Sequence, residues 1–315
     1  MKLLSEVPFT DLYLEKDAAN SRFRGLYGAD ELQPTPHELV EDMNRLYKTV
    51  LQVHEANVIA PDFSVSFEDI LYRVAVIPDI RSKVFALRRG STHVPQLDKC
   101  GIKSLVIDHL LNLKNGLVLF CGSFSSGKTT AASAYVLEYV RKNGGMAITL
   151  EDPPELALSG DHGLGRVLQV QVNKKEIEDA VVNTLRMSFD MLFVSEIRTP
   201  AMAQEIISSS SNGKLIVATI HAKDLVDAVS RLINLSLDKD TKSAERVMSE
   251  MLANSLRAIV HMDKLNETQR AATAYLLGNN EVRAKIMSNE LQSLRNVVNM
   301  QMNMLDMGKQ PGKSD

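Results

Sequence analysis

The 315-residue sequence contains no tryptophan, only two cysteines and few aromatic residues, with Phe, Trp and Tyr together at 5%. Cys100 and Cys121 form neither a CxxC pair nor a set of metal ligands, which fits a reducing compartment. No apolar run approaches the ~18 residues of a membrane-spanning helix, and Glu6 and Asp11 interrupt the N-terminus where a signal peptide has its apolar stretch. We therefore expect a cytoplasmic protein without a transmembrane segment, which reaches a membrane only peripherally or through a partner.

The chain also lacks a strong excess of either charge, since its formal net charge is −3. Proteins that bind nucleic acid without sequence preference combine a basic surface with aromatic side chains on which bases stack. Neither feature is evident here, so we expect no direct nucleic-acid partner.

A glycine-rich loop between a short apolar run and an Ala-rich segment is the most informative feature that the chain does contain. Residues 117–121 predict a buried strand and residues 129–142 predict a helix. The loop between them has the G-x-x-x-x-G-K-T pattern of a P-loop, in which backbone amides hold phosphate groups. An ordinary glycine turn is the alternative, and the flanking strand and helix argue against it. We predict that ATP is held by Gly122, Ser123, Ser125, Ser126, Gly127, Lys128, Thr129 and Thr130.

Two residues of this loop have specific chemistry. The ammonium of Lys128 would reach the β- and γ-phosphates, and the Thr129 hydroxyl would ligate Mg²⁺.

From residue 102 onward, predicted strands and helices alternate, which is typical of a parallel sheet with crossover helices. The sequence therefore predicts an α/β domain over residues 102–307. Its predicted elements are helix 102–114, strand 117–121, helix 129–142, strand 146–150, helix 174–187, strand 191–195, helix 200–210, strand 215–220 and mostly helical structure through 242–260 and 281–306.

The first part of the chain has a different pattern. Residues 1–95 predict a small α+β domain of antiparallel strands, a linker follows at 96–101, and the polar residues 308–315 predict a frayed tail. Its predicted elements are strands 11–14, 22–27, 62–67, 70–77 and 81–88 and helix 37–53.

Three polar residues fall at the ends of predicted strands of the larger domain: Glu151, Glu196 and His221. Ligands of open α/β sheets bind at the carboxyl ends of the strands. We expect these side chains to face one crevice together with the P-loop.

The order of these motifs resembles that of the type II/IV secretion ATPases, the PilT/GspE family of hexameric motors. The resemblance covers nearly the whole chain and rests on the P-loop, residues 148–155 (ITLEDPPE), residues 190–198 (DMLFVSEIR) and residues 213–221 (GKLIVATIH). Residues 11–14 and 62–64, and the spacing of Arg73, Arg81 and Arg88, are similar to the N-terminal domain of that family. Ser195 departs from the glycine that the family usually has before its Walker B glutamate.

The resemblance implies a RecA-like P-loop motor domain preceded by a PAS-like N-terminal domain. It also implies Mg²⁺-dependent ATP hydrolysis by a cytoplasmic hexameric ring that drives a type IV pilus, conjugation or secretion machine. The implied partners are further copies of the chain and an inner-membrane platform or secretion-channel protein.

The resemblance also assigns roles to individual residues. Glu196 would orient or deprotonate the attacking water and help hold Mg²⁺, and Glu151 would polarise the same water. Spacing alone leaves open which glutamate is the principal base; we favour Glu196 for metal and water geometry and Glu151 for activation of the water. His221 would act as a sensor of the phosphate, although a histidine after a strand is more often structural.

Arg73, Arg81 and Arg88 would neutralise charge on the γ-phosphate, and their alternative is a place on the solvated face of an antiparallel sheet.

Three other functions compete with the motor. A RecA-like nucleic-acid translocase shares the P-loop and the sheet, a nucleotide-gated scaffold would bind ATP and hydrolyse it negligibly, and a small-molecule kinase would need a lid and an acceptor site that the sequence does not reveal.

Overall fold

The computed structural model describes residues 3–56, 62–80, 82–90, 93–173, 176–237, 242–266 and 268–311. Contacts divide the chain into two compact units. Unit 1 comprises Met1–Val94 together with Asp152–Ala157 and Gln171–Asn173, and unit 2 comprises Pro95–Glu151, Leu158–Val170 and Lys174–Asp315.

Unit 1 contains a six-stranded antiparallel sheet in the order β3-β2-β1-β6-β5-β4, with helix α1 packed against it. Alternate residues of its strands are buried; in β1, for example, Leu12 and Leu14 are buried while Asp11 and Tyr13 are half-buried. The elements are β1 (Asp11–Leu14), β2 (Arg22–Arg24), β3 (Gln33–Pro34), α1 (Val40–Ala56), β4 (Asp62–Phe67), β5 (Ile70–Pro78) and β6 (Lys83–Arg89).

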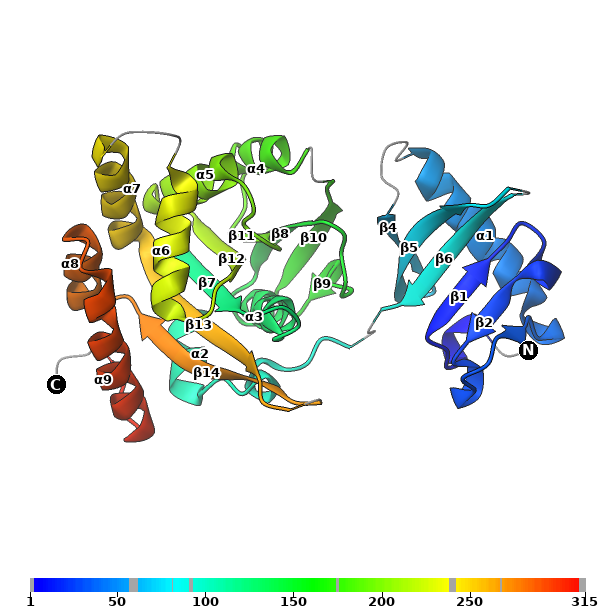
Figure 1. Ribbon diagram of the computed structural model, residues 1–315, viewed down its shortest axis with the longest axis horizontal. Helices are drawn as coiled ribbons and strands as arrows, with labels where there is room; N and C mark the ends of the chain where they lie inside the picture. Colours follow the sequence, from blue (N-terminus) through cyan, green and yellow to red (C-terminus); the bar gives the residue numbers. More distant parts are fainter. Residues whose placement is uncertain are drawn as a thin grey trace. The chain divides into compact units, whose positions relative to one another are not determined.

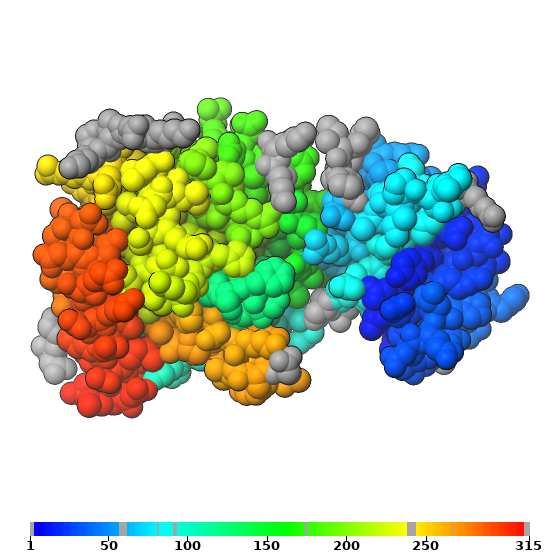
Figure 2. Space-filling view, viewed as in Figure 1, coloured from blue at the N-terminus to red at the C-terminus, as the bar shows by residue number. Residues whose placement is uncertain are grey.

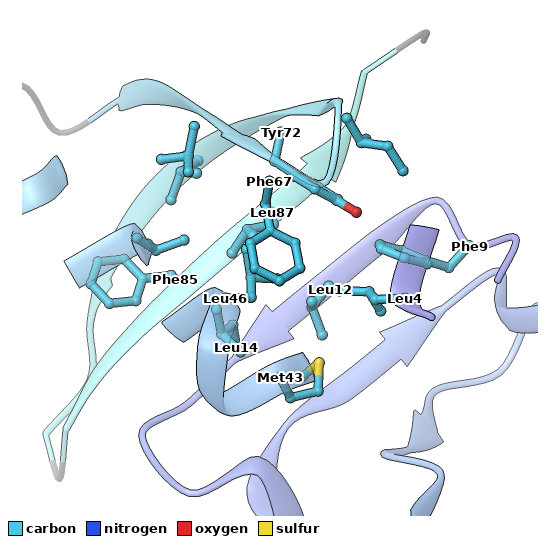
Figure 3. Packing of buried hydrophobic residues seen from close by; sticks show 14 of the residues in the cluster. Leu4, Phe9, Leu12, Leu14, Met43, Leu46, Phe67, Tyr72, Phe85 and Leu87 are labelled. Carbon is cyan, nitrogen blue, oxygen red and sulfur yellow. The ribbon is translucent and has the colours of Figure 1, made fainter. Parts of the chain in front are cut away.

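Figure 3 shows how side chains from β1, β5, β6 and α1 converge in the core of unit 1. Met43 and Leu46, one turn apart on α1, face Leu12 and Leu87 of the sheet. Each fully buried side chain of this size stabilises the fold by about 1.5–3 kcal/mol. The period of two in the strands and of three to four in the helix thus gives the sheet one apolar and one polar face.

Unit 2 is built on an eight-stranded sheet in the order β14-β13-β7-β12-β11-β8-β10-β9 (Figure 1). Its central strands β13, β7, β12, β11 and β8 are parallel to one another. Every residue of β7 is buried, as in parallel strands that are covered on both faces. The elements are α2 (Ser104–Leu111), β7 (Gly116–Gly122), α3 (Lys128–Asn143), β8 (Gly145–Glu151), β9 (Gly160–His162), β10 (Gly165–Gln171), α4 (Ile177–Leu185), β11 (Met191–Val194), α5 (Pro200–Ser211), β12 (Leu215–His221), α6 (Leu225–Ser236), α7 (Lys242–Ser255), β13 (Leu256–Lys264), β14 (Arg270–Leu277), α8 (Asn280–Met287) and α9 (Leu294–Asp306).

This architecture confirms the predicted fold class, a mostly parallel α/β sheet and a smaller α+β part with antiparallel strands. Figure 1 shows α8 beside both α7 and α9, and α9 packs against β14. Among the helices of the described residues, none has the length and hydropathy needed to span a bilayer.

One expectation for the C-terminal part is wrong and another is confirmed. The helix predicted over 242–260 ends at Ser255, and Leu256–Lys264 forms β13, which inserts between β7 and β14. The mostly helical structure predicted through 281–306 is confirmed as α8 and α9, between which the chain turns near Asn289, whose φ is +57°. Strands β9 and β10 were not among the predicted elements.

Candidate active site

The candidate residues predicted from the sequence lie at or near the carboxyl ends of four adjacent strands. Because β7, β12, β11 and β8 are parallel and neighbours, their ends share one edge of the sheet. The P-loop follows β7, His221 ends β12, Glu196 comes shortly after β11 and Glu151 ends β8. The P-loop, His221, Glu196 and Glu151 therefore lie in this order along one edge of the sheet, where the sequence predicted a crevice.

The P-loop has a backbone that only glycine allows at its first position. Gly122 has φ +151°, and a Cβ there would lie 2.1 Å from the Met262 carbonyl oxygen of β13. Gly127, with φ +90°, caps the N-terminus of α3, whose first amides have no partner within the helix. Arg270 of β14 donates from Nε to the Ser125 carbonyl oxygen at 3.1 Å. The loop is thus supported by the β13–β14 hairpin, and Figure 2 shows both the green α3 segment and the orange hairpin on one face.

One polar atom within the loop is left for a ligand. The Ser126 hydroxyl is buried and has no hydrogen-bond partner among the described residues. An unsatisfied buried hydroxyl costs about 1–3 kcal/mol, and a phosphate oxygen would accept its hydrogen bond. Together with the open amides of α3, it makes the loop fit a phosphate group.

Lys128 is the charged residue at the centre of the site. Its side chain is buried, and Nζ donates to the Ser123 carbonyl oxygen at 2.6 Å and lies 3.4 Å from Nδ1 of His221. Burial lowers the pKa of the ammonium, and the nearby Glu196 carboxylate opposes this effect.

Glu196 is held at both carboxylate oxygens. Oε1 lies 3.2 Å from Nε2 of His221, and Oε2 accepts from Nε of Arg198 at 2.9 Å. Lys128, His221, Glu196 and Arg198 therefore form one continuous chain of polar contacts along the edge of the sheet.

His221 joins the two halves of this chain. Burial is the main cause that lowers the pKa of its imidazole, the Lys128 ammonium lowers it further, and Glu196 opposes both. A neutral imidazole accepts at one nitrogen and donates at the other. The contacts assign Nδ1 as acceptor toward Lys128 and Nε2 as donor toward Glu196. The exposed Phe124 ring stacks on the imidazole with centroids 6.2 Å apart.

Glu151 has a separate set of partners. Its side chain is buried, and Oε1 accepts from the Thr149 hydroxyl at 2.7 Å and from Nε2 of Gln169 at 2.8 Å. Gln169 lies on β10, and sequence reasoning missed it. A short signal was present, because residues 168–171 alternate apolar and polar side chains as a strand does.

A pocket of about 530 Å³ lies beside the polar chain and is bounded in part by α6. Arg231 of α6 donates from Nη1 to the His221 carbonyl oxygen at 3.0 Å and pairs with Asp227 at 3.2 Å. Sequence reasoning missed Arg198 and Arg231, because arginines beside a strand end or on a helix give no distinctive pattern. The lining residues are Glu196, Ile197, Arg198, Ile220, His221, Arg231, Asn234 and Leu235.

The remaining predicted loop residues differ in exposure. Ser123 and Ser125 are exposed, while Thr129 and Thr130 are half-buried in the first turn of α3. In the described part of the chain, no cluster of three or more His, Cys, Asp or Glu side chains could hold a metal ion. Such a cluster is not needed for Mg²⁺, because this ion usually binds through few protein groups together with water and substrate phosphates. The predicted ligands Thr129 and Glu196 would fit that kind of site.

The predicted arginines belong to unit 1. Arg73 and Arg88 are register partners on β5 and β6, so their side chains share the polar face of that sheet. Arg88 donates from Nε to Asp11 at 2.9 Å, and Nη1 of Arg73 lies 3.7 Å from Glu155. Arg81 lies outside the described residues.

Known proteins with similar sequences and folds point to one family. A sequence model described as type II/IV secretion system protein matches residues 62–301. The chain is 29% identical over 200 residues to the uncharacterized protein YggR of Escherichia coli K12, an alignment that covers 63% of this chain and 60% of YggR. It is 29% identical over 183 residues to the type IV pilus ATPase PilU of Pseudomonas aeruginosa, covering 58% and 46%. Both alignments span less than two thirds of the relative.

Solved structures agree with this assignment. The pilus retraction motor PilT with bound ADP matches with a TM-score of 0.74 and 25% identity, covering 95% of this chain and 87% of PilT. The ATPase DotB of Legionella pneumophila has the same fold, with a TM-score of 0.69 and 17% identity over 91% and 84% of the two chains. Since the family model extends over well more than half of the sequence, this chain belongs to the type II/IV secretion system protein family.

Proposed function

We propose that the protein hydrolyses ATP with Mg²⁺ and works as a hexameric cytoplasmic motor of a type IV pilus or a type IV secretion or conjugation machine. The observation that carries this proposal is the chain of contacts from Lys128 through His221 to Glu196 at the end of a P-loop. It is supported by membership of the family and by the relatives PilU and PilT, which are named as a pilus ATPase and a retraction motor.

Phosphoryl transfer to water depends on positioning and charge compensation. Lys128 would exchange the Ser123 carbonyl for β- and γ-phosphate oxygens, and the Ser126 hydroxyl and the α3 amides would bind the remaining oxygens. Glu196 would hold the attacking water, and the buried Glu151 would draw its proton. Mg²⁺, held by the Thr129 hydroxyl and through water by Glu196, would neutralise phosphate charge when bound.

His221 would sense the phosphate. Because its imidazole contacts both Lys128 and Glu196, a movement of Lys128 toward the nucleotide changes the contacts of the glutamate as well. Loss of the γ-phosphate would reverse that movement.

Arg73 and Arg88, and Arg81 beyond the described residues, would supply positive charge to the γ-phosphate. Both described arginines are now paired with carboxylates, Glu155 and Asp11, and would have to leave them. Closure of unit 1 on ATP and release with ADP would then produce the mechanical stroke, which the ring would pass to an inner-membrane platform or a secretion-channel protein.

Steady-state ATPase measurements test this function. We expect wild-type turnover that requires Mg²⁺, a loss of about 100-fold or more in Lys128→Ala, and nucleotide binding without turnover in Glu196→Gln. Lys142→Ala, at the exposed far end of α3, is the matched control and should keep full turnover. Absence of wild-type turnover would instead support the scaffold, and strong stimulation by single-stranded DNA would support the translocase. Light scattering with a non-hydrolysable ATP analogue tests the hexamer.

A further inference from the structure

The chain passes between the two units at the point where the active site is built. It leaves unit 2 directly after Glu151, contributes Asp152–Ala157 to unit 1 and returns to unit 2 at Leu158. It then contributes Gln171–Asn173 to unit 1. We call Asp152–Ala157 the strap.

Gln169 joins the two ends of the strap within unit 2. Its Nε2 donates to Oε1 of Glu151 at 2.8 Å, and its Oε1 accepts from the Leu158 backbone amide at 3.0 Å. One side-chain amide therefore connects the last residue before the strap with the first residue after it. His162 adds a contact of 2.8 Å between its ring Nε2 and the Leu158 carbonyl oxygen.

Ser64 of β4 forms hydrogen bonds with both of these segments of unit 1, the strap and Gln171–Asn173. Its hydroxyl donates to the Pro154 carbonyl oxygen at 2.7 Å, and its backbone amide donates to Oε1 of Gln171 at 2.7 Å. The strap is also packed closely, because a Cβ on Gly90 would lie 3.1 Å from the Glu155 carbonyl oxygen. Ser64 therefore anchors Pro154, three residues after Glu151, and Gln171, two residues after Gln169.

We propose that Gln169 and Ser64 are positioning residues that set the direction of the Glu151 carboxylate from the two ends of the strap. This proposal rests on the proposed function in that Glu151 activates water there. A displacement of β4 moves the Pro154 carbonyl, which is three residues from Glu151 along the chain. The same displacement moves Gln171 and with it Gln169, the donor to Glu151. A displacement within unit 1 is thus passed to the glutamate along the chain that links the two units.

Turnover and nucleotide affinity of four variants test the proposal. Gln169→Leu removes the hydrogen bonds of the Gln169 amide to Glu151 and Leu158, which we call the clamp. It should lower kcat about ten-fold or more, while the dissociation constant of a fluorescent ADP analogue stays within about two-fold. Ser64→Ala should lower kcat about three-fold or more in the same way, and Ser64→Thr, which keeps the hydroxyl, should restore it. Gln204→Leu on α5 removes an amide hydrogen bond to the Ser236 carbonyl oxygen on α6 and serves as the control with unchanged kcat.

Hydrogen exchange gives a readout that does not depend on turnover. Ser64→Ala should increase exchange in peptides that cover Leu158–Val170 of unit 2, whereas Gln204→Leu should not. Normal kcat and unchanged exchange in Ser64→Ala, with an active wild type, would overturn the strap proposal alone. An inactive wild type that still shows the exchange effect would overturn the proposed function and leave the mechanical connection in place.

Discussion

Replacing Gly122 by alanine tests how closely the P-loop is fitted to the strand beside it. Gly122 ends β7, and the added Cβ would lie 2.1 Å from the Met262 carbonyl oxygen and 2.6 Å from the Ser126 hydroxyl. The Met262 oxygen belongs to the backbone of β13, which is paired with both β7 and β14 and has little freedom to move.

Two terms set the size of the effect. Backbone strain for alanine at φ +151° contributes about 1–3 kcal/mol. The overlap with a fixed backbone atom contributes about another 1–3 kcal/mol. Their total is a large part of the 5–15 kcal/mol that is typical for the free energy of unfolding of a domain. If the loop shifts to relieve the overlap, the amides that would bind phosphate shift with it.

Gly213→Ala is the matched control for this substitution. Gly213 also has a positive φ, +91°, but a Cβ there has no neighbour within 4 Å. Urea unfolding should therefore show Gly122→Ala to be less stable than Gly213→Ala by about 1–3 kcal/mol, the overlap term alone. Titration with a fluorescent ADP analogue should show weakened binding only in Gly122→Ala. Equal stability and equal affinity of the two variants would refute the reasoning.

Three further predictions concern the polar residues. Burial and the Lys128 ammonium hold the pKa of His221 below 6.5, so its NMR titration should have a midpoint under that value and rise in Lys128→Met; a wild-type midpoint at or above 6.5 would contradict this. As the pH falls, the imidazole of the unfolded chain is protonated at a higher pH than that of the folded protein. The stability that His221 contributes should therefore be lost as the pH falls through 6.5 toward the folded pKa. Glu196, Arg198 and Arg231 are the other charged groups that act on the ring. Gln301→Leu should lower the free energy of unfolding by about 2–5 kcal/mol in urea titrations, since both backbone groups of Leu277 lose a buried partner, and a loss under ~0.5 kcal/mol would refute that role. Arg73→Ala should reduce kcat about ten-fold or more with little change in nucleotide affinity. Unchanged kcat would show that Arg73 is an ordinary residue of the solvated sheet face.

The motifs at the strand ends could be predicted because each depends on a short stretch of sequence. A P-loop needs its glycines, Lys128 and Thr129 within eight residues, and Glu151 and His221 each end an apolar run that reads as a strand. The parallel order of the strands then places them at one edge by geometry alone.

The C-terminal hairpin could not be predicted in the same way. Leu256–Lys264 continues directly from α7, and its apolar residues fit the end of a helix as well as a strand. It becomes a strand because it pairs with β7, more than a hundred residues earlier, and with β14. Such long-range pairing outweighs local preference.

The clamp on Glu151 was missed for a related reason. Gln169, like Arg198, is an ordinary polar residue whose importance comes from one contact, and that contact depends on where the chain crosses between the units. Alternation in residues 168–171 could have revealed the strand, but nothing in the sequence indicates the partner of the amide.

The support of the P-loop by the C-terminal hairpin sets a limit on how the molecule can be shortened. Arg270 holds the Ser125 carbonyl across 145 residues of sequence, and Met262 forms the wall against which Gly122 rests. A protein truncated after Ser255 would keep every residue of the nucleotide-binding motif and lose β13 and β14, which fix the conformation of that motif. The shortest version of unit 2 in which that motif keeps its form therefore extends at least through β14.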